Sequence, residues 1–232
     1  MLGRTGDVAQ ARRLTSYIQG TQTRLREAQV AIATGKRAQV YSAIGSEPGV
    51  LLQAREGLQR AGAFVNGNIA TGERLRLMDG ALANVVDIAD RMRSLLVQRL
   101  DPAIGPSLPL GPEIDSMLQE IASQLNTQLG DRYLFAGSRT NTAPLVLPAT
   151  INGPADLDPT SIYRGDDVRL TARVALDVEI EYGILATDVV DVMQTLAAAK
   201  EAHVANDTDG LRTAMDTLGQ AYVEGLIDVD GR

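Results

Sequence analysis

Apolar and small residues recur every three or four positions between Ala11 and Ile32. This is the heptad spacing of a helix that packs along one seam, so we predict a helix from about residue 7 to residue 34, ended by Gly35. A lone helix of this kind is marginal in water, and we therefore expect another helix to cover the seam. The large residues of this expected assembly interface are Leu14, Ile18, Leu25 and Ile32.

A second helical pattern begins near Ser46, a candidate N-cap, with Pro48 in its first turn. It continues to residue 100 without another proline, with one apolar stripe along its length. The pattern predicts one helix far longer than the usual ~11–12 residues. The segment 101–112 contains four prolines and two glycines and is expected to break the helix. A third helix is predicted at about 113–130.

The pattern then changes from helical periodicity to alternation. The stretches "RYLFAGS", "APLVLPATI" and "SIYRGDDVRLTARVALDVEIEYG" alternate like strands, and turn residues separate them. From Val168 to Tyr182 every second residue is apolar or small, which predicts a half-buried strand or hairpin. Helices are predicted again at about 187–204 and 208–226.

These patterns predict a mainly α fold with a small β insert, in which a long antiparallel helical rod carries a β-rich knob. We divide the chain into an N-terminal coiled-coil helix segment (1–36), the first part of the rod (37–130), the β-rich insert (131–184) and the second part of the rod (185–232). Aromatic residues are scarce, with 2 Phe and 6 Tyr in 232 residues, yet Tyr133 and Phe135 lie close together. One strand period separates them, so we expect both to anchor the insert against the rod.

Composition gives little support for catalysis. Cysteine is absent, which excludes disulfides, thiol nucleophiles and Cys-ligated metals. The one histidine, His203, is expected to be exposed near a helix C-terminus, and the chain has no phosphate loop or dinucleotide fingerprint. Asp207, Asp209 and Asp216 partly fit a calcium loop, but Ala205 occupies its first position, so a helix-capping role is favoured. We expect no enzyme, cofactor or metal.

Charge is unevenly distributed along the chain. Residues 1–100 hold 14 Lys and Arg against 8 Asp and Glu, and residues 101–232 hold 8 against 21. No aromatic platform accompanies the basic half, so we expect attraction between the halves or between subunits rather than nucleic-acid binding. No apolar run reaches the ~20 residues of a membrane span. The first 20 residues lack a signal-peptide pattern, and any export is expected to use another route.

Residues 164–166 read Arg-Gly-Asp, the sequence of an adhesion tripeptide, but a three-residue match arises readily by chance. We interpret this segment as a turn between strands, in which Gly165 adopts a special backbone conformation.

The stretch "LNTQLGDRYLFAGSRTNTAPL" (125–145) and the later "YRGDD" resemble the flagellin superfamily. Within it, the sequence is most similar to the family of flagellar hook-associated protein 3, the outer of two hook–filament junction proteins. The segment "IATGKRAQV" (32–40) resembles the family's link between the first and the long second helix. The matching motif positions are Asn126, Tyr133, Leu134, Phe135, Ala136, Gly137, Thr140, Pro144, Tyr163, Gly165 and Asp166.

Two parts of the sequence depart from the family pattern. Many members carry an Asp-Asp-Pro segment where this chain reads "YSAIGSEPGV". Members also close with a long C-terminal heptad helix that pairs with the N-terminal one, whereas this chain stops at Arg232. We therefore expect either a truncated chain or an unusually short member.

The resemblance implies a non-enzymatic structural component of the bacterial flagellum that links hook-associated protein 1 to the flagellin filament. The implied partners are hook-associated protein 1, flagellin, further copies of the chain in a ring, and an export chaperone. The implied location is extracellular, reached through the flagellar type III pathway without a cleaved signal peptide. Two alternatives remain: flagellin itself, and an adhesive module whose insert binds a ligand, receptor or polysaccharide.

Overall fold

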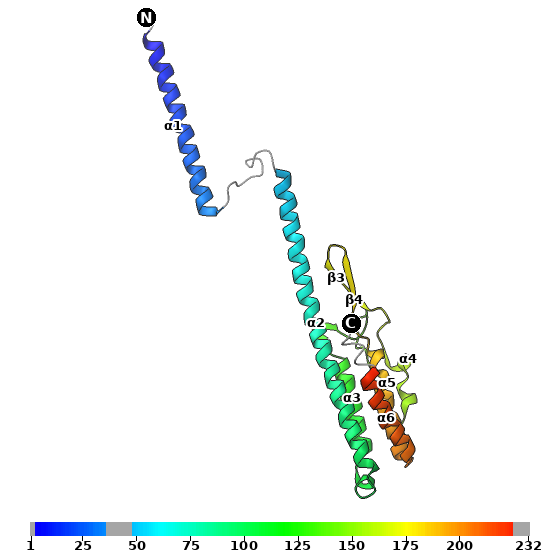
Figure 1. Ribbon diagram of the computed structural model, residues 1–232. Coiled ribbons are helices and arrows are strands. Elements are labelled where there is room, and N and C mark those ends of the chain that lie inside the picture. Colours follow the sequence, from blue (N-terminus) through cyan, green and yellow to red (C-terminus); the bar gives the residue numbers. More distant parts are fainter. Residues whose placement is uncertain (1–2, 36–47, 225–232) are drawn as a thin grey trace. The chain divides into compact units, whose positions relative to one another are not determined.

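The computed structural model describes residues 3–35 and 48–224 (Figure 1). The chain forms two compact units, Met1–Gly62 and Ala63–Arg232. Helix α2 (Pro48–Leu100) contributes residues to both units, and its bounds agree with the predicted long helix.

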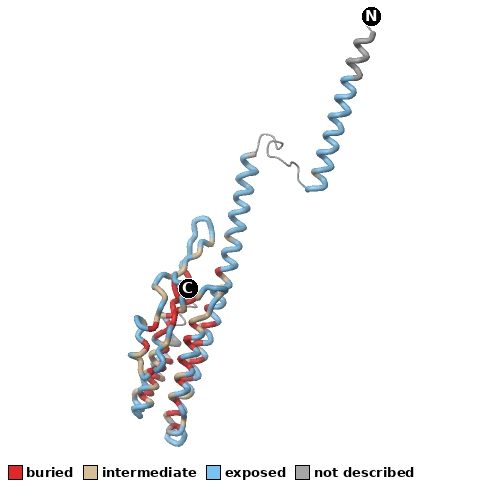
Figure 2. The backbone as a smooth tube through the Cα atoms, turned by 180° about the vertical axis from the view of Figure 1, so that it is seen from behind, coloured by how far each residue is buried: buried red, intermediate tan, exposed pale blue. Residues whose placement is uncertain are grey.

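The first unit contains helix α1 (Gly3–Thr34) and the first part of α2. Gly35 follows α1 with a φ of +65°, a left-handed conformation that ends helices and that glycine adopts without steric cost. From Arg12 onward, nearly every side chain of α1 is exposed (Figure 2). The candidate cap Ser46 and most of the 32–40 segment lie outside the described residues.

The second unit is built around one apolar core that four helices share. They are the C-terminal half of α2, α3 (Leu110–Leu125), α5 (Val190–Val204) and α6 (Thr208–Glu224). Figure 2 shows the buried segments along these helices. The core includes Ile88, Met92 and Leu96 of α2, Ile114, Leu118 and Ile121 of α3, Met193 and Leu196 of α5, and Leu211 and Leu218 of α6.

Helix α3 ends five residues earlier than predicted, at Leu125. The chain then forms a short antiparallel hairpin, in which β1 (Gln128–Leu129) pairs with β2 (Arg132–Tyr133). Gly130 makes the tight turn with a φ of +63°. The helical periodicity of the sequence continued into this hairpin because Leu125 and Leu129 keep a spacing of four.

The insert contains fewer strand residues than the sequence suggested. Its longest ribbon is the antiparallel pair β3 (Leu170–Ala175) and β4 (Val178–Tyr182). The predicted strand around Leu145 is reduced to one bridge with Tyr163. The insert also contains two short helical turns, η3 (Pro154–Leu157) and α4 (Pro159–Ile162), and a third, η4 (Ala186–Val189), follows it before α5. The fold class, mainly α with a small β insert, is confirmed.

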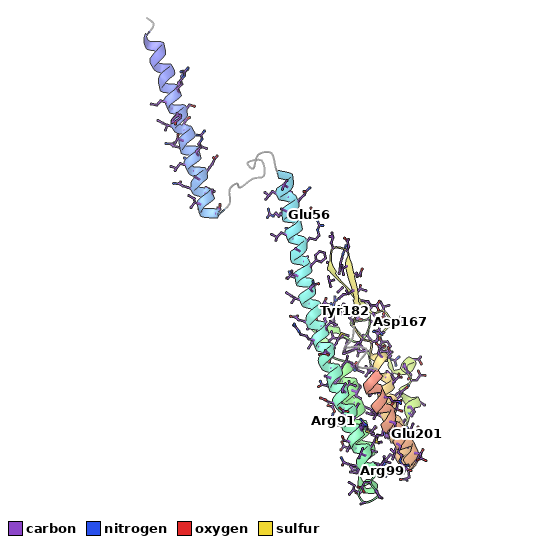
Figure 3. All side chains as sticks on the ribbon, in the orientation of Figure 1. Glu56, Arg91, Arg99, Asp167, Tyr182 and Glu201 are labelled. Carbon is purple, nitrogen blue, oxygen red and sulfur yellow. The ribbon has the colours of Figure 1, made fainter. Side chains whose placement is uncertain are left out.

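The predicted half-buried face of the β3–β4 hairpin is covered over part of its length, since Tyr182 is buried and Leu170, Ala172 and Val174 are partly buried. The rest of that face stays exposed, with exposed fractions between 39% and 54% for Val168, Leu176, Val178 and Ile180. Polar contacts hold the hairpin to α2: Asn68 Nδ2 donates to the Val174 carbonyl at 3.2 Å, and Arg74 Nη1 to the Tyr182 hydroxyl at 3.0 Å (Figure 3 labels Tyr182). The alternation therefore predicted the strands and their face correctly, but it carried no information on whether a partner covers that face.

Two further features of the second unit complete the fold. A 3-10 turn, η2 (Gly105–Ser107), lies in the predicted break between α2 and α3. The two C-terminal helices α5 and α6 pack side by side after a tight turn at Asn206, whose φ is +56°. Within the described ranges, no helix is both long enough and apolar enough to cross a lipid bilayer.

Candidate functional site

The residues that carry the sequence motifs come together in the second unit, and we call them the motif cluster: Asn126, Tyr133, Phe135, Gly137, Ser138, Tyr163, Gly165 and Asp166. Asp166 lies at its centre. Its Oδ1 accepts the Ser138 N–H at 2.7 Å and its Oδ2 accepts the Ser138 hydroxyl at 2.5 Å. These hydrogen bonds hold the pKa of Asp166 below its usual value, since they favour the charged carboxylate. Ser138 is not among the residues predicted from the sequence.

Tyr163 also helps to connect the two motif segments, residues 133–138 and 163–166. Its hydroxyl donates to the main-chain carbonyl of Asp166 at 2.7 Å, and the Asp166 N–H donates to the Ala136 carbonyl at 3.2 Å. Burial raises the pKa of Tyr163 to about 12, and the nearby charge of Asp166 adds to the effect. Tyr163 is therefore a neutral hydrogen-bond donor over the whole physiological pH range.

Both motif glycines are required by their surroundings, for different reasons. Gly137 has a φ of +66°, and a Cβ there would collide with the side chain and main chain of Asp166. Gly165 lies against the Tyr163 ring, and a Cβ would lie 2.6 Å from the Ala136 carbonyl. Gly165 does not have a positive φ, so the prediction of a special conformation there was wrong. Lack of space, rather than backbone conformation, requires glycine at position 165.

The neighbouring aromatics Tyr133 and Phe135 lie in different environments. Phe135 is fully buried in the core, and its carbonyl accepts the N–H of Ala186 at 3.0 Å, where η4 leads into α5. Tyr133 is half-buried in β2, and its N–H donates to the Thr140 carbonyl at 2.7 Å. The Phe135 segment thus connects the insert to the helical bundle.

At the end of α3, the side chain of Asn126 pairs with the main chain of Leu145 as a neighbouring strand would. Its Oδ1 accepts the Leu145 N–H at 3.0 Å, and its Nδ2 donates to the Leu145 carbonyl at 2.9 Å. The amide thereby satisfies both main-chain polar groups of a buried residue. This pair of bonds closes the loop formed by residues 127–144.

Lys200 of α5 ties three segments together and was missed by sequence analysis. Its Nζ donates to Asp115 Oδ1 of α3 at 2.5 Å and to the Ile151 carbonyl at 2.6 Å. The side chain is 13% exposed, so the ammonium group depends on these acceptors in place of water. The available signal was the lysine that ends the apolar run "LAAAK" (196–200).

His203 is half-buried, not exposed as predicted. Its Nδ1 accepts a hydrogen bond from Nε of Arg99, a buried residue at the end of α2, at 2.9 Å (Figure 3 labels Arg99). Arg99 Nη2 also donates to Asn206 Oδ1 at 3.2 Å. Burial and the Arg99 charge lower the pKa of His203. Since no carboxylate of the described residues bonds to it, this neutral imidazole has no triad partner.

Asp207 caps helix α6, as favoured over a calcium loop. Its Oδ1 accepts the N–H groups of Asp209 and Gly210, both at 3.0 Å. The described part of the chain contains no group of three or more His, Asp or Glu side chains arranged to hold a metal ion.

The predicted seam of α1 lies in the first unit. Exposed fractions are 64% for Leu14, 48% for Ile18, 59% for Leu25 and 83% for Ile32. These residues form an exposed apolar row, interrupted by Thr21, without a described partner on the same unit. They remain the candidate assembly interface.

Comparison with known proteins places these features in a family. Residues 8–140 match the model of the bacterial flagellin N-terminal helical region. No curated protein sequence matches the chain. The fold is similar to that of FlgL from Bacillus cereus, with a TM-score of 0.59 and 20% sequence identity over 76% of this chain and 84% of that chain.

A second solved structure, from Vibrio parahaemolyticus, belongs to a protein provisionally assigned as a flagellar hook-associated protein. It has a TM-score of 0.53 and 15% identity, over 83% of this chain and 90% of that chain. At these identities the two structures establish a shared fold. The family match includes most of α1, all of α2 and α3, and the first motif segment, which is more than half of the 232 residues. The chain therefore belongs to the bacterial flagellin family, of which it carries the N-terminal helical region.

Proposed function

We propose that this protein is a non-enzymatic structural subunit of the flagellum that links hook-associated protein 1 to the flagellin filament. The observation that carries the proposal is the fold shared over 84% and 90% of the lengths of two solved chains, a FlgL and a provisional hook-associated protein. Membership of the flagellin family supports a place in the flagellar axis.

The exposed seam of α1 supports an assembly role. Four large apolar side chains between Leu14 and Ile32 are about half exposed or more, a cost that a subunit avoids once a neighbouring helix covers them. The proposed partners across such surfaces are hook-associated protein 1, flagellin and further copies of the chain in a ring. Delivery by an export chaperone through the flagellar type III pathway belongs to the same proposal.

Complementation tests this function directly. The full-length gene is returned to a strain that lacks it, and attached filaments are counted by electron microscopy while flagellin in the medium is quantified. Restored attachment with less free flagellin is the expected outcome. Attachment no better than with an empty vector would contradict the proposal.

A matched pair of variants tests the seam in the same strain. Leu14→Asp with Ile18→Asp places two charges on the seam, and we expect attachment to be lost while export continues. Ser16→Asp with Thr23→Asp adds the same charge on the opposite side of α1 and is expected to leave attachment intact. Equal loss in both variants would remove the seam from the assembly interface.

Flagellin itself remains the second candidate, because the matched family model is named for flagellin. A flagellin polymerises alone into long filaments, whereas a junction protein needs a neighbouring ring of a different protein. Incubating the purified full-length protein with filament seeds distinguishes them, since sustained elongation would identify a flagellin.

The exposed positions on the apolar face of the β3–β4 hairpin support a third candidate, an adhesive module. Val178 and Ile180, which are 48% and 39% exposed, belong to this face. If it serves adhesion, Val178→Ser with Ile180→Ser would abolish binding of cells to a surface while filaments stay attached. Unchanged binding would exclude this candidate.

A further inference from the structure

The dipeptide Asn-Gly occurs twice in the chain, at residues 66–67 and 152–153. In this dipeptide the main-chain nitrogen of the glycine can attack the side-chain amide carbon of the asparagine, because glycine has no Cβ to obstruct the approach. Whether the attack occurs depends on the freedom of that nitrogen. The two copies therefore form an internal comparison.

The two copies differ in whether the main-chain N–H of the glycine is hydrogen-bonded. Residues 66–67 lie inside helix α2, where the Gly67 N–H donates to the carbonyl four residues earlier. Residues 152–153 lie in an irregular segment just before η3, and Gly153 is extended with φ −165° and ψ 179°. Among the described residues, neither the Gly153 N–H nor the Asn152 side-chain amide has a hydrogen-bond partner. Asn152 is also exposed to water, the second reactant.

We propose that Asn152 is a site of spontaneous hydrolytic deamidation. The Gly153 nitrogen forms a bond to Asn152 Cγ, and the side-chain amide leaves as ammonia with the proton from the Gly153 N–H. Water then opens the five-membered imide at either carbonyl, by breaking one of its two C–N bonds. The product at position 152 is aspartate or isoaspartate, and no oxidant, metal or enzyme takes part.

The surroundings of Asn152 give this reaction a structural consequence. The preceding Ile151 is buried, and its carbonyl accepts the Lys200 bond. The Asn152 N–H donates to Asp156 Oδ2 at 2.8 Å, and a Cβ on Gly153 would lie 2.7 Å from Glu201 Oε2.

A new carboxylate at position 152 therefore joins two existing ones, from Asp156 and Glu201, and like charges repel. Isoaspartate in addition lengthens the main chain by one methylene between Ile151 and Pro154. Both products weaken the attachment of the 151–157 segment to α5. The proposal is independent of the flagellar function proposed above.

The test uses the whole chain, aged in mildly alkaline buffer and digested for peptide mapping by mass spectrometry. Peptides with Asn152 gain the small mass that accompanies replacement of NH2 by OH. We expect Asn152 to react at least about ten-fold faster than Asn66, because the Gly67 N–H is released only by local opening of the helix. Asn152→Gln, which cannot form the five-membered ring, is expected to stay unmodified.

Hydrogen exchange on the aged protein tests the structural consequence. Amides of residues 151–153 and 155–157 should exchange faster in the aged wild type than in aged Asn152→Gln, with exchange in α2 unchanged. Equal rates at Asn66 and Asn152, or an intact Asn152 when the urea-unfolded chain deamidates, would overturn the proposal. Unaltered exchange after complete reaction would overturn the structural part of it.

Discussion

Helix α1 and the C-terminal half of α2 have the same apolar periodicity and opposite burial. Leu14, Ile18 and Leu25 of α1 are 48–64% exposed, whereas Ile88 and Leu96 of α2 are at most 1% exposed. In the second case α3, α5 and α6 cover the apolar row; in the first, the described unit contains no element that does so. A three-four repeat thus identifies a helix and its apolar face, but the partner must come from elsewhere in the chain or from another chain.

The largest expected effect comes from removing one aromatic side chain from the core that covers α2 and one from the exposed helix α1. Phe135→Ala should lower the free energy of unfolding by about 3–5 kcal/mol, because it opens a cavity in the shared core. Tyr17→Ala removes a ring of α1 that is 76% exposed, and should change it by no more than about 0.5 kcal/mol. Urea denaturation followed by circular dichroism measures both. Similar losses would mean that α1 is covered in solution.

The next largest effect comes from two glycines of the second unit that share a left-handed conformation. Gly130→Ala has open space around it and should cost about 1–2 kcal/mol through backbone strain alone. Gly137→Ala suffers the same strain and also collides with Asp166, so its loss should be larger by about 1 kcal/mol or more. Thermal unfolding of both variants gives the difference. Equal losses would show that the motif cluster rearranges around the added methyl group at little cost in free energy.

Acid should weaken the motif cluster while leaving the α1 seam unaffected. The pKa of Asp166 is lowered from 3.8 in the folded state, so its stabilising contribution is present above pH 3.8 and is lost as the pH falls through the folded value. Asp166→Asn should be less stable than wild type at neutral pH and lose less on acidification. Asp177→Asn, in the exposed hairpin turn, controls for removal of one negative charge. Parallel pH profiles for all three proteins would contradict this.

The smallest effect concerns the end of the bundle, where Arg99 meets His203. The pKa of His203 is lowered from 6.5, so its contribution to stability is complete above pH 6.5 and falls as the pH drops through the folded pKa. Because the chain has one histidine, proton NMR follows its titration without ambiguity. Arg99→Met should raise this pKa, since it removes the neighbouring cation. An unchanged titration would mean that burial alone lowers it.

The helices could be predicted from sequence because their signals are local. Pro48 in the first turn, the unbroken run to residue 100 and the proline-rich break determined α2. The Asp207 cap marked the start of α6 in the same way. Each of these signals acts within one or two helical turns.

The residues of the motif cluster could be predicted from the sequence, but the contacts between them could not. Ser138 and Asp166 are 28 positions apart, and nothing near either residue indicates the other. Lys200 and Asp115 are separated by 85 positions. The strands predicted around residues 132–151 are reduced to β2 and the Leu145–Tyr163 bridge for a related reason. There the side chains of Asn126 and Asp166 satisfy main-chain groups that a sheet would otherwise pair.

The long sequence separations in the motif cluster have a kinetic consequence. The α5–α6 pair closes through a short turn, whereas the Phe135–Ala186 bond must close a loop of about fifty residues, which costs more chain entropy. We therefore expect the helical pair to be formed in the folding transition state and the motif cluster to form after it. A substitution in the cluster would then accelerate unfolding and leave the refolding rate nearly unchanged, so that the cluster determines how long the folded protein survives and not how quickly it appears.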